Sequence, residues 1–346
     1  MLDYNASVLL IYTGGTIGMT EDAATGALKS FDFGYLKEHV PELNRLNFNI
    51  DNVPFEQPVD SSDMGPEEWK KIVRIIEDSY AKYDGFVVLH GTDTMAYSAS
   101  ALSFMLENLN KPVILTGSQL PIGKIRTDGK ENLITALEIA VDKNQAGEAL
   151  VPEVCIFFQN LLMRGNRTTK INAENFKAFN SFNYPILAEA GTYILYKHDL
   201  IHRPPKSSPA RFRYLLDTNV AIIKLFPGIS PATLTSIIAT PNLKGIVLET
   251  YGAGNAPGES RFLAAVEEGV KKGIVVVNVT QCASGSVEMN RYQAGKALKN
   301  IGVLSGYDIT TEAAVTKLMF LFGHGLSAEQ VKEQMKISRA GEMTAP

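Results

Sequence analysis

Cysteine is scarce in this chain, and no apolar run is long enough to cross a membrane. Only Cys155 and Cys282 occur among 346 residues, so at most one disulfide could form. We expect buried free thiols instead, because each cysteine lies in or just after an apolar run. A membrane-spanning helix needs ~18 to 20 apolar residues, and the N-terminal residues lack the basic region, apolar core and cleavage site of a signal peptide. We therefore expect a cytoplasmic protein.

Basic residues are not in excess either. The chain has 33 lysines and arginines against 37 aspartates and glutamates, for a net charge of −4. Because nucleic-acid binding depends on neutralising phosphates, this balance argues against nucleic acid as a partner and favours a small ligand. The 45% hydrophobic and 20% charged content is typical of a globular protein. A length of 346 residues exceeds what one hydrophobic core usually supports, which predicts two domains.

Short apolar runs alternate with helical patterns in the first half of the chain. Continuous runs of this kind are typical of parallel strands buried on both faces. They lie at residues 7–13, 85–90, 112–116 and 154–158. Between the first two, Pro66 begins a helical pattern whose apolar residues share one face. This alternation predicts an α/β fold with a larger N-terminal, doubly wound, mainly parallel sheet domain.

A proline-rich segment interrupts this pattern before a second set of strands. Residues 196–217 contain Pro204, Pro205 and Pro209, and we place the domain linker there. The predicted N-terminal catalytic domain is then 1–195, and a smaller C-terminal α/β domain is 218–346. In the second domain we expect strands at 220–226, 245–248 and 274–279, and a last helix that begins with a capping box at Ser327–Gln330.

Two predicted strands end in polar, glycine-containing turns. The first runs into Thr13-Gly14-Gly15-Thr16-Ile17-Gly18, and the second into His90-Gly91-Thr92-Asp93-Thr94-Met95. Ligands bind at the carboxyl edge of such sheets, so Thr16 and the Thr92–Asp93 pair are candidate site residues. Each segment also has a simpler interpretation. The first could be a tight turn, and in the second Asp93 or Thr94 could cap the helix that follows.

Together the two segments match the TGGTI and HGTDTM signatures of the asparaginase and glutaminase family. Further stretches resemble its type I, cytosolic branch, so the resemblance covers nearly the whole chain. These stretches are Asp60-Ser61-Ser62-Asp63-Met64, Thr116-Gly117-Ser118-Gln119, Arg164-Gly165-Asn166-Arg167-Thr168-Thr169-Lys170 and Tyr251-Gly252-Ala253-Gly254-Asn255.

The resemblance implies that Thr16 is the nucleophile and that Thr92, Asp93 and Lys170 form the polar constellation of the family. A threonine hydroxyl needs an adjacent base at neutral pH, and a lysine can serve if its proton is shared or its pKa is lowered. Asp93 would orient Lys170, and Lys170 would act through Thr92 on the proton being moved. The alternative for Lys170 is an ordinary surface charge.

The same resemblance assigns a substrate loop. Asp60, Ser61 and Ser62 would hold the α-carboxylate of an amino acid, while Asp93 pairs with its α-ammonium group. We add Thr92 and Asn255 to the predicted substrate-binding residues. The alternative for the two serines is a turn before the Pro66 helix.

One departure from the family pattern concerns a tyrosine. Many members have one in the segment after TGGTI, where this chain reads Gly26-Ala27-Leu28, and the next tyrosine is Tyr35. In animal-like members a tyrosine of a neighbouring subunit is thought to fill the role, and here Tyr292 is our candidate. Its alternative is a surface tyrosine near a turn.

The resemblance implies hydrolysis of L-asparagine to L-aspartate and ammonia through a threonine acyl-enzyme. It also implies a homo-oligomer, a dimer of dimers, and no metal or organic cofactor. Three alternatives stay open: a mixed glutaminase-asparaginase, a catalytically silent asparagine-binding oligomer, and the archaeal subunit that releases ammonia for transamidation of glutamyl-tRNA. An acidic charge balance disfavours the last.

Overall fold

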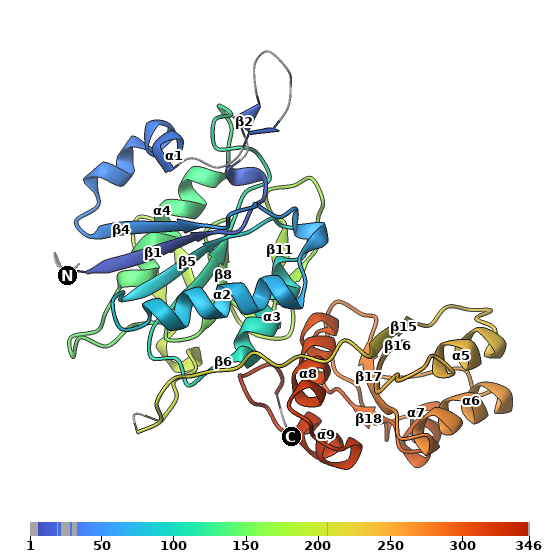
Figure 1. Ribbon diagram of the computed structural model, residues 1–346. Helices are drawn as coiled ribbons and strands as arrows, with labels where there is room; N and C mark the ends of the chain where they lie inside the picture. Colours follow the sequence, from blue (N-terminus) through green and yellow to red (C-terminus); the bar gives the residue numbers. More distant parts are fainter. Residues whose placement is uncertain (1–5, 19, 22–27, 30–32, 206, 345–346) are drawn as a thin grey trace. The chain divides into compact units, whose positions relative to one another are not determined.

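The computed structural model describes residues 6–18, 20–21, 28–29, 33–205 and 207–344 (Figure 1). Contacts divide the chain into two compact units, Met1–Tyr214 and Leu215–Pro346. The expected two-domain α/β fold is confirmed. The boundary lies inside the predicted linker, 196–217, but most of that segment packs on the first unit. Tyr196 belongs to a paired strand, and Ile201 is 7% exposed. The prolines prevent long helices and strands in this segment, but the segment still packs on the first unit.

The N-terminal unit is built on an eight-stranded sheet in the order β13-β12-β9-β8-β7-β5-β1-β4. Five neighbouring strands, from β8 to β4, are parallel, whereas β9, β12 and β13 run antiparallel at one edge. The strands are β1 (Ser7–Tyr12), β4 (Asn49–Pro54), β5 (Gly85–Leu89), β7 (Val113–Thr116), β8 (Val154–Phe158), β9 (Leu161–Arg164), β12 (Ala188–Ala190) and β13 (Ile194–Tyr196).

Helices cover both faces of this sheet, which explains why its central strands are apolar throughout. Every residue of β5, β7 and β8 is buried. Figure 1 shows α4 (Gly129–Val141) on one face and α2 (Pro66–Ser79) and α3 (Met95–Met105) on the other. The predicted apolar face of α2 is confirmed, with Trp69, Ile72, Val73 and Ile76 buried. A short helix, α1 (Phe33–His39), packs its Leu36 into the same core as α4.

Short pieces complete the unit. Pairs of two-residue strands are β2 (Thr20–Glu21) with β3 (Leu28–Lys29), β6 (Leu106–Glu107) with β14 (Arg211–Phe212), and β10 (Thr169–Lys170) with β11 (Phe179–Asn180). The 3-10 helices are η1 (Thr16–Gly18), η2 (Pro41–Arg45), η3 (Ser61–Asp63), η4 (Gly165–Arg167) and η5 (His198–Leu200).

The C-terminal unit has a parallel four-stranded sheet with helices on both faces. Its strands are β15 (Val220–Lys224), β16 (Gly245–Thr250), β17 (Val275–Thr280) and β18 (Leu304–Ser305), in that order. Its helices are α5 (Pro231–Ile238), α6 (Ser260–Lys271), α7 (Gln293–Asn300), α8 (Thr311–Gly323) and α9 (Ala328–Met335). The capping box predicted for the last helix is present at Ser327 and Gln330.

Both cysteines are free thiols, but only one is buried. Cys155 lies inside β8, where burial raises its pKa well above the usual value, whereas Cys282 is exposed. The expectation of burial is therefore wrong for Cys282, because the chain leaves the sheet after β17 and turns to the surface. Within the described ranges, no helix is both long and apolar enough to cross a membrane.

Candidate active site

The candidate site lies where the direction of strand addition reverses. After β1 the chain adds β4 on one side, and it then crosses to the other side of β1 to add β5, β7 and β8. Ligands of doubly wound folds bind at such a switch point, beyond the carboxyl ends of the strands. Thr16 follows β1, and Thr92 and Asp93 follow β5, so the topology brings both sequence motifs to the same edge of the sheet.

Three glycines allow the chain segments at this edge of the sheet to touch through their backbones. Gly14 and Gly15 have φ angles of 137° and 90°, which favour glycine. A Cβ on Gly15 would lie 2.5 Å from the nitrogen of Gly91, and one on Gly91 would lie 2.6 Å from Cβ of Ser61. No side chain fits in these spaces. The segments that carry Thr16, the Thr92–Asp93 pair and the Ser61 turn are therefore in direct contact.

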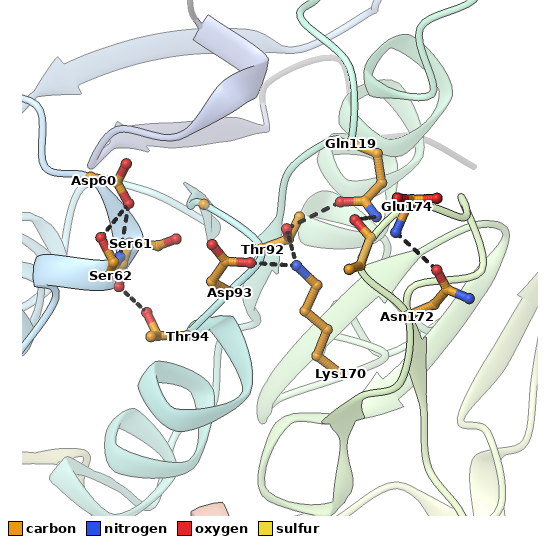
Figure 2. A network of polar contacts seen from close by, with 12 residues as sticks. Asp60, Ser61, Ser62, Thr92, Asp93, Thr94, Gln119, Lys170, Asn172 and Glu174 are labelled. Atoms are coloured by element: carbon orange, nitrogen blue, oxygen red, sulfur yellow. Dashed lines mark hydrogen bonds and ion pairs between the residues drawn. The ribbon is translucent and has the colours of Figure 1, made fainter.

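Thr92, Asp93 and Lys170 form one polar cluster. The Nζ atom of Lys170 donates to Thr92 Oγ1 at 2.8 Å and to Asp93 Oδ1 at 2.6 Å (Figure 2). Thr92 is 9% exposed, whereas the side chain of Asp93 is 66% exposed. The interpretation of Lys170 as an ordinary surface charge is wrong, because its side chain is only 17% exposed and it contacts both residues. The carboxylate of Asp93 remains accessible to a ligand.

Lys170 is brought to the cluster by a buried turn. Strand β9 ends at Arg164, whose side chain is 5% exposed and pairs with Glu153 at 2.6 Å. The guanidinium group of Arg164 also lies 4.3 Å from the ring centre of Tyr184. These contacts fix the start of η4, and β10 then carries Lys170 towards β5. Glu153 and Tyr184 gave no signal in the sequence, because they act through contacts with residues distant along the chain.

The turn at Asp60–Ser62 is held by its own hydrogen bonds. Asp60 Oδ1 accepts from the backbone nitrogen of Ser62 at 2.9 Å and from its hydroxyl at 2.8 Å, and these bonds lower the pKa of Asp60. Thr94 does not cap α3 with its side chain but donates to the carbonyl of Ser61 at 2.6 Å. The turn and the α3 start are thus joined, and Figure 2 shows Ser61 and Ser62 beside Asp93 and Thr94.

His90, which precedes Gly91 and Thr92, is a buried and neutral side chain. It is 1% exposed, and burial lowers its pKa to about 4. Its Nδ1 lies 2.6 Å from the carbonyl of Gly91, which can only accept, so Nδ1 carries the proton. Its Nε2 lies 2.8 Å from Ser98 Oγ, which in turn accepts from Trp69 Nε1 at 2.8 Å. Both ring nitrogens are occupied by these contacts, so the imidazole is held in one orientation.

Gln119 is a member of the cluster to which the sequence assigned no role. Its Oε1 accepts from Thr92 Oγ1 at 3.2 Å. Its Nε2 donates to the carbonyls of Ala173 and Asn175, each at 3.1 Å. In the sequence, Gln119 stood out only as the last residue of Thr116–Gln119, one of the stretches that resemble the family.

Two predicted site residues belong to the C-terminal unit. Tyr292 immediately precedes α7 and is 47% exposed. Asn255 exchanges backbone hydrogen bonds with Tyr251, at 2.8 and 2.9 Å. Neither is joined to Thr92, Asp93 or Lys170 by these contacts. Gly26 and Ala27, where the family tyrosine is missing, lie outside the described residues. Among the residues that the structure describes, no group of three histidine, cysteine or acidic side chains could hold a metal ion.

The chain matches family models and known proteins over nearly its whole length. The asparaginase N-terminal model matches residues 7–202, and the glutaminase/asparaginase C-terminal domain matches 219–335. L-asparaginase 1 of Escherichia coli K12 is 42% identical over 98% of both chains. A mouse protein named 60 kDa lysophospholipase is also 42% identical, but this chain spans only 63% of its length.

Solved structures agree with these matches. The crystal structure of L-asparaginase I from Vibrio cholerae has a TM-score of 0.89 at 40% identity, covering 98% of this chain and 99% of that one. The thermostable L-asparaginase from Thermococcus kodakarensis has a TM-score of 0.89 at 35% identity, covering 98% and 100%. With both family models matched and the polar cluster beyond the carboxyl ends of β1 and β5, the chain belongs to the asparaginase family of amidohydrolases, in its type I branch.

Proposed function

We propose that this protein hydrolyses L-asparagine to L-aspartate and ammonia through an acyl-enzyme on Thr16. The observation that carries the proposal is the cluster in which Lys170 Nζ contacts both Thr92 Oγ1 and Asp93 Oδ1, at 2.8 and 2.6 Å. It lies beyond the end of β5, beside the strand that leads to Thr16. The names of the E. coli and V. cholerae relatives support the same substrate.

The proposed reaction has two displacements. Oγ1 of Thr16 attacks the side-chain amide carbon, its proton moves through the cluster to the amide nitrogen, and the C–N bond breaks as ammonia leaves. Water then attacks the resulting ester, which releases aspartate and returns the proton to Thr16. Lys170, as the neutral amine, is the base and acts through Thr92, while Asp93 orients it by accepting a hydrogen bond from its Nζ. The hydroxyl of Tyr292, from a neighbouring subunit, assists the proton transfer at Thr16.

Substrate binding needs opposite charges at the two ends of a zwitterion. The second oxygen of Asp93 is free to pair with the α-ammonium group, since Lys170 binds Oδ1. In the Asp60–Ser62 turn the donors of Ser62 bind Asp60 and hold the loop, so the hydroxyl of Ser61 is the donor for the α-carboxylate, and Asn255 completes the binding residues. We further propose a homo-oligomer, arranged as a dimer of dimers, in the cytoplasm.

Ammonia release by Thr16→Ala tests the nucleophile. We expect kcat to fall by several orders of magnitude while the fold and the oligomer stay intact, because a methyl group cannot form the ester. Circular dichroism and gel filtration check the fold and the assembly. Turnover above a tenth of the wild-type rate would refute the assignment.

The substrate preference is tested by comparing kcat/KM for asparagine and glutamine. One extra methylene moves the amide away from Thr16, and a misplacement on the order of 1 Å can cost ~10²-fold in rate. We therefore expect a preference for asparagine of about that size. Equal values would instead support a mixed glutaminase-asparaginase, and binding of asparagine without any ammonia release would support a silent binding protein.

A further inference from the structure

Asp128 directly precedes helix α4, yet its side chain does not cap that helix. The backbone nitrogen of Gly129, the first helical residue, donates instead to Thr127 Oγ1 at 3.0 Å. The carboxylate of Asp128 turns back towards the end of β7. Both of its oxygens accept from the backbone nitrogen of Gln119 at 3.0 Å, and Oδ1 also accepts from that of Leu120 at 3.2 Å.

One turn later in α4, Asn132 holds the same segment from its carbonyl side. Its Nδ2 donates to the carbonyl of Gly117 at 3.0 Å and lies 3.4 Å from Asp128 Oδ2. On its other side Gly117 packs against the backbone of His90, where a Cβ would lie 2.3 Å from the carbonyl oxygen. Residues 117–120 are therefore clamped between α4 and the end of β5, and the backbone of Gln119 has a fixed position.

The fixed backbone gives the Gln119 side chain a single arrangement. Its Nε2 faces the carbonyls of Ala173 and Asn175, which can only accept, so its Oε1 must face Thr92. The oxygen of Thr92 already accepts from the ammonium group of Lys170. Its own proton therefore points to Gln119, and Figure 2 shows Gln119 and Lys170 on the two sides of Thr92.

We propose that Asp128 is a positioning residue for catalysis, which fixes the position of Thr92 Oγ1 beside Lys170 through Gln119. The inference rests on the proposed function, in which Thr92 relays a proton between the reacting groups and Lys170. Without the carboxylate, the two backbone nitrogens lose their acceptor and Gln119 drifts from Thr92. The Oγ1 atom of Thr92 then has no fixed position relative to Lys170, and the relay is misaligned although Thr92, Asp93 and Lys170 are all present.

The substitution Asp128→Asn tests the clamp, because it keeps the size of the side chain but replaces one acceptor oxygen with a donor. We expect kcat to fall by ~10- to 100-fold, the range for a displacement on the order of 1 Å, with little change in KM. Asp217→Asn is the matched control. Oδ1 of Asp217 also accepts from a backbone nitrogen, that of Asn219 at 2.8 Å, but in the C-terminal unit, and this variant should keep its kcat.

A double-mutant cycle with Gln119→Met separates positioning from general stability. Gln119→Met touches no backbone contact of the clamp and should by itself reproduce the loss in kcat. In that background Asp128→Asn should cost little more, because both changes break the same chain of contacts. Independent, multiplicative losses would overturn the proposal, as would normal kcat in Gln119→Met, or a rise in KM alone. An active Thr16→Ala variant would instead refute the proposed function, so the two failures are distinguishable.

Discussion

At the scale of single residues, Lys170 is the group on which the proposed proton transfer depends. Lys170→Met removes the amine but keeps an unbranched chain of similar size. We expect kcat for asparagine to fall by ~10²- to 10⁴-fold, the usual contribution of a general base. Steady-state rates of ammonia release give kcat for this variant and for the wild type.

A matched control is available for that variant. Lys82 also donates to an aspartate and a hydroxyl, Asp51 Oδ2 at 3.1 Å and Tyr83 Oη at 2.7 Å, but it lies at the opposite, amino-terminal end of β5. Lys82→Met should therefore keep normal turnover. A near-normal kcat in Lys170→Met would move the base elsewhere in the site.

His90 links the site to the pH dependence of stability. Burial lowers its folded pKa to about 4, whereas an unfolded histidine titrates near ~6.5. Between these values the unfolded chain binds the extra proton, so the free energy of unfolding decreases as the pH falls from about 6.5 to about 4, by about 3 kcal/mol in total.

Urea unfolding of wild type and His90→Gln over this pH range tests the effect. The carboxylates titrate in both proteins. The difference between the two curves of unfolding free energy against pH therefore gives the contribution of His90. Glutamine does not titrate, and we expect the variant to lose less stability on acidification. Parallel curves would contradict a neutral, buried His90.

Residues of the candidate site could be predicted from the sequence where they directly follow a predicted strand. Thr16, Thr92 and Asp93 lie directly after apolar runs, and parallel strands bring such ends together. Lys170 was found only by resemblance, because a buried turn and the Arg164–Glu153 pair deliver it to the site. The role of Asp128 was not predicted, because its partners are backbone nitrogens. Every residue except proline has one, so the sequence does not show which of them a side chain will bind.

At the scale of elements, the central strands and α2 were predictable because burial on both faces makes their residues uniformly apolar. Strand β4 was not predicted. It lies at the edge of the sheet and buries none of its residues fully. The antiparallel strands β12 and β13 were also missed, because they are three residues long and carry exposed apolar residues such as Leu195.

The C-terminal segment after α9 is attached to α8 by a fully buried ion pair. Lys317 and Glu342 have no exposed side-chain surface and are 2.6 Å apart. Glu342 also accepts from the backbone nitrogens of Arg339 and Ala340. Because removing one partner leaves the other charge buried alone, Glu342→Gln should lower the free energy of unfolding by about 3–5 kcal/mol.

Chemical unfolding of three variants tests this attachment. The double variant Lys317→Met/Glu342→Gln should be more stable than Glu342→Gln, since no unpaired charge remains. As a control, Lys272→Met breaks an exposed pair with Glu268 and should change stability by less than about 1 kcal/mol. Equal losses in Glu342→Gln and Lys272→Met would contradict the role of the buried pair.

At the scale of the whole molecule, the two units divide the predicted site residues between them. Thr16, Thr92, Asp93 and Lys170 belong to the first unit, and Tyr292 and Asn255 belong to the second. The two-domain organisation was predictable from chain length.

If a neighbouring subunit supplies Tyr292, the site is shared and complementation should reveal it. Tyr292→Phe should lower kcat with little change in stability, because it removes one exposed hydroxyl and keeps the ring.

Mixed oligomers of Thr16→Ala and Tyr292→Phe subunits, purified through two different tags, should regain activity. One of the two composite sites in each mixed dimer then has both wild-type residues. If instead the tyrosine acted within its own subunit, each site would lack one residue, and the mixed oligomers would be no more active than the variants alone. Full activity of Tyr292→Phe would exclude this hydroxyl and leave Thr92 and Lys170 to move the proton.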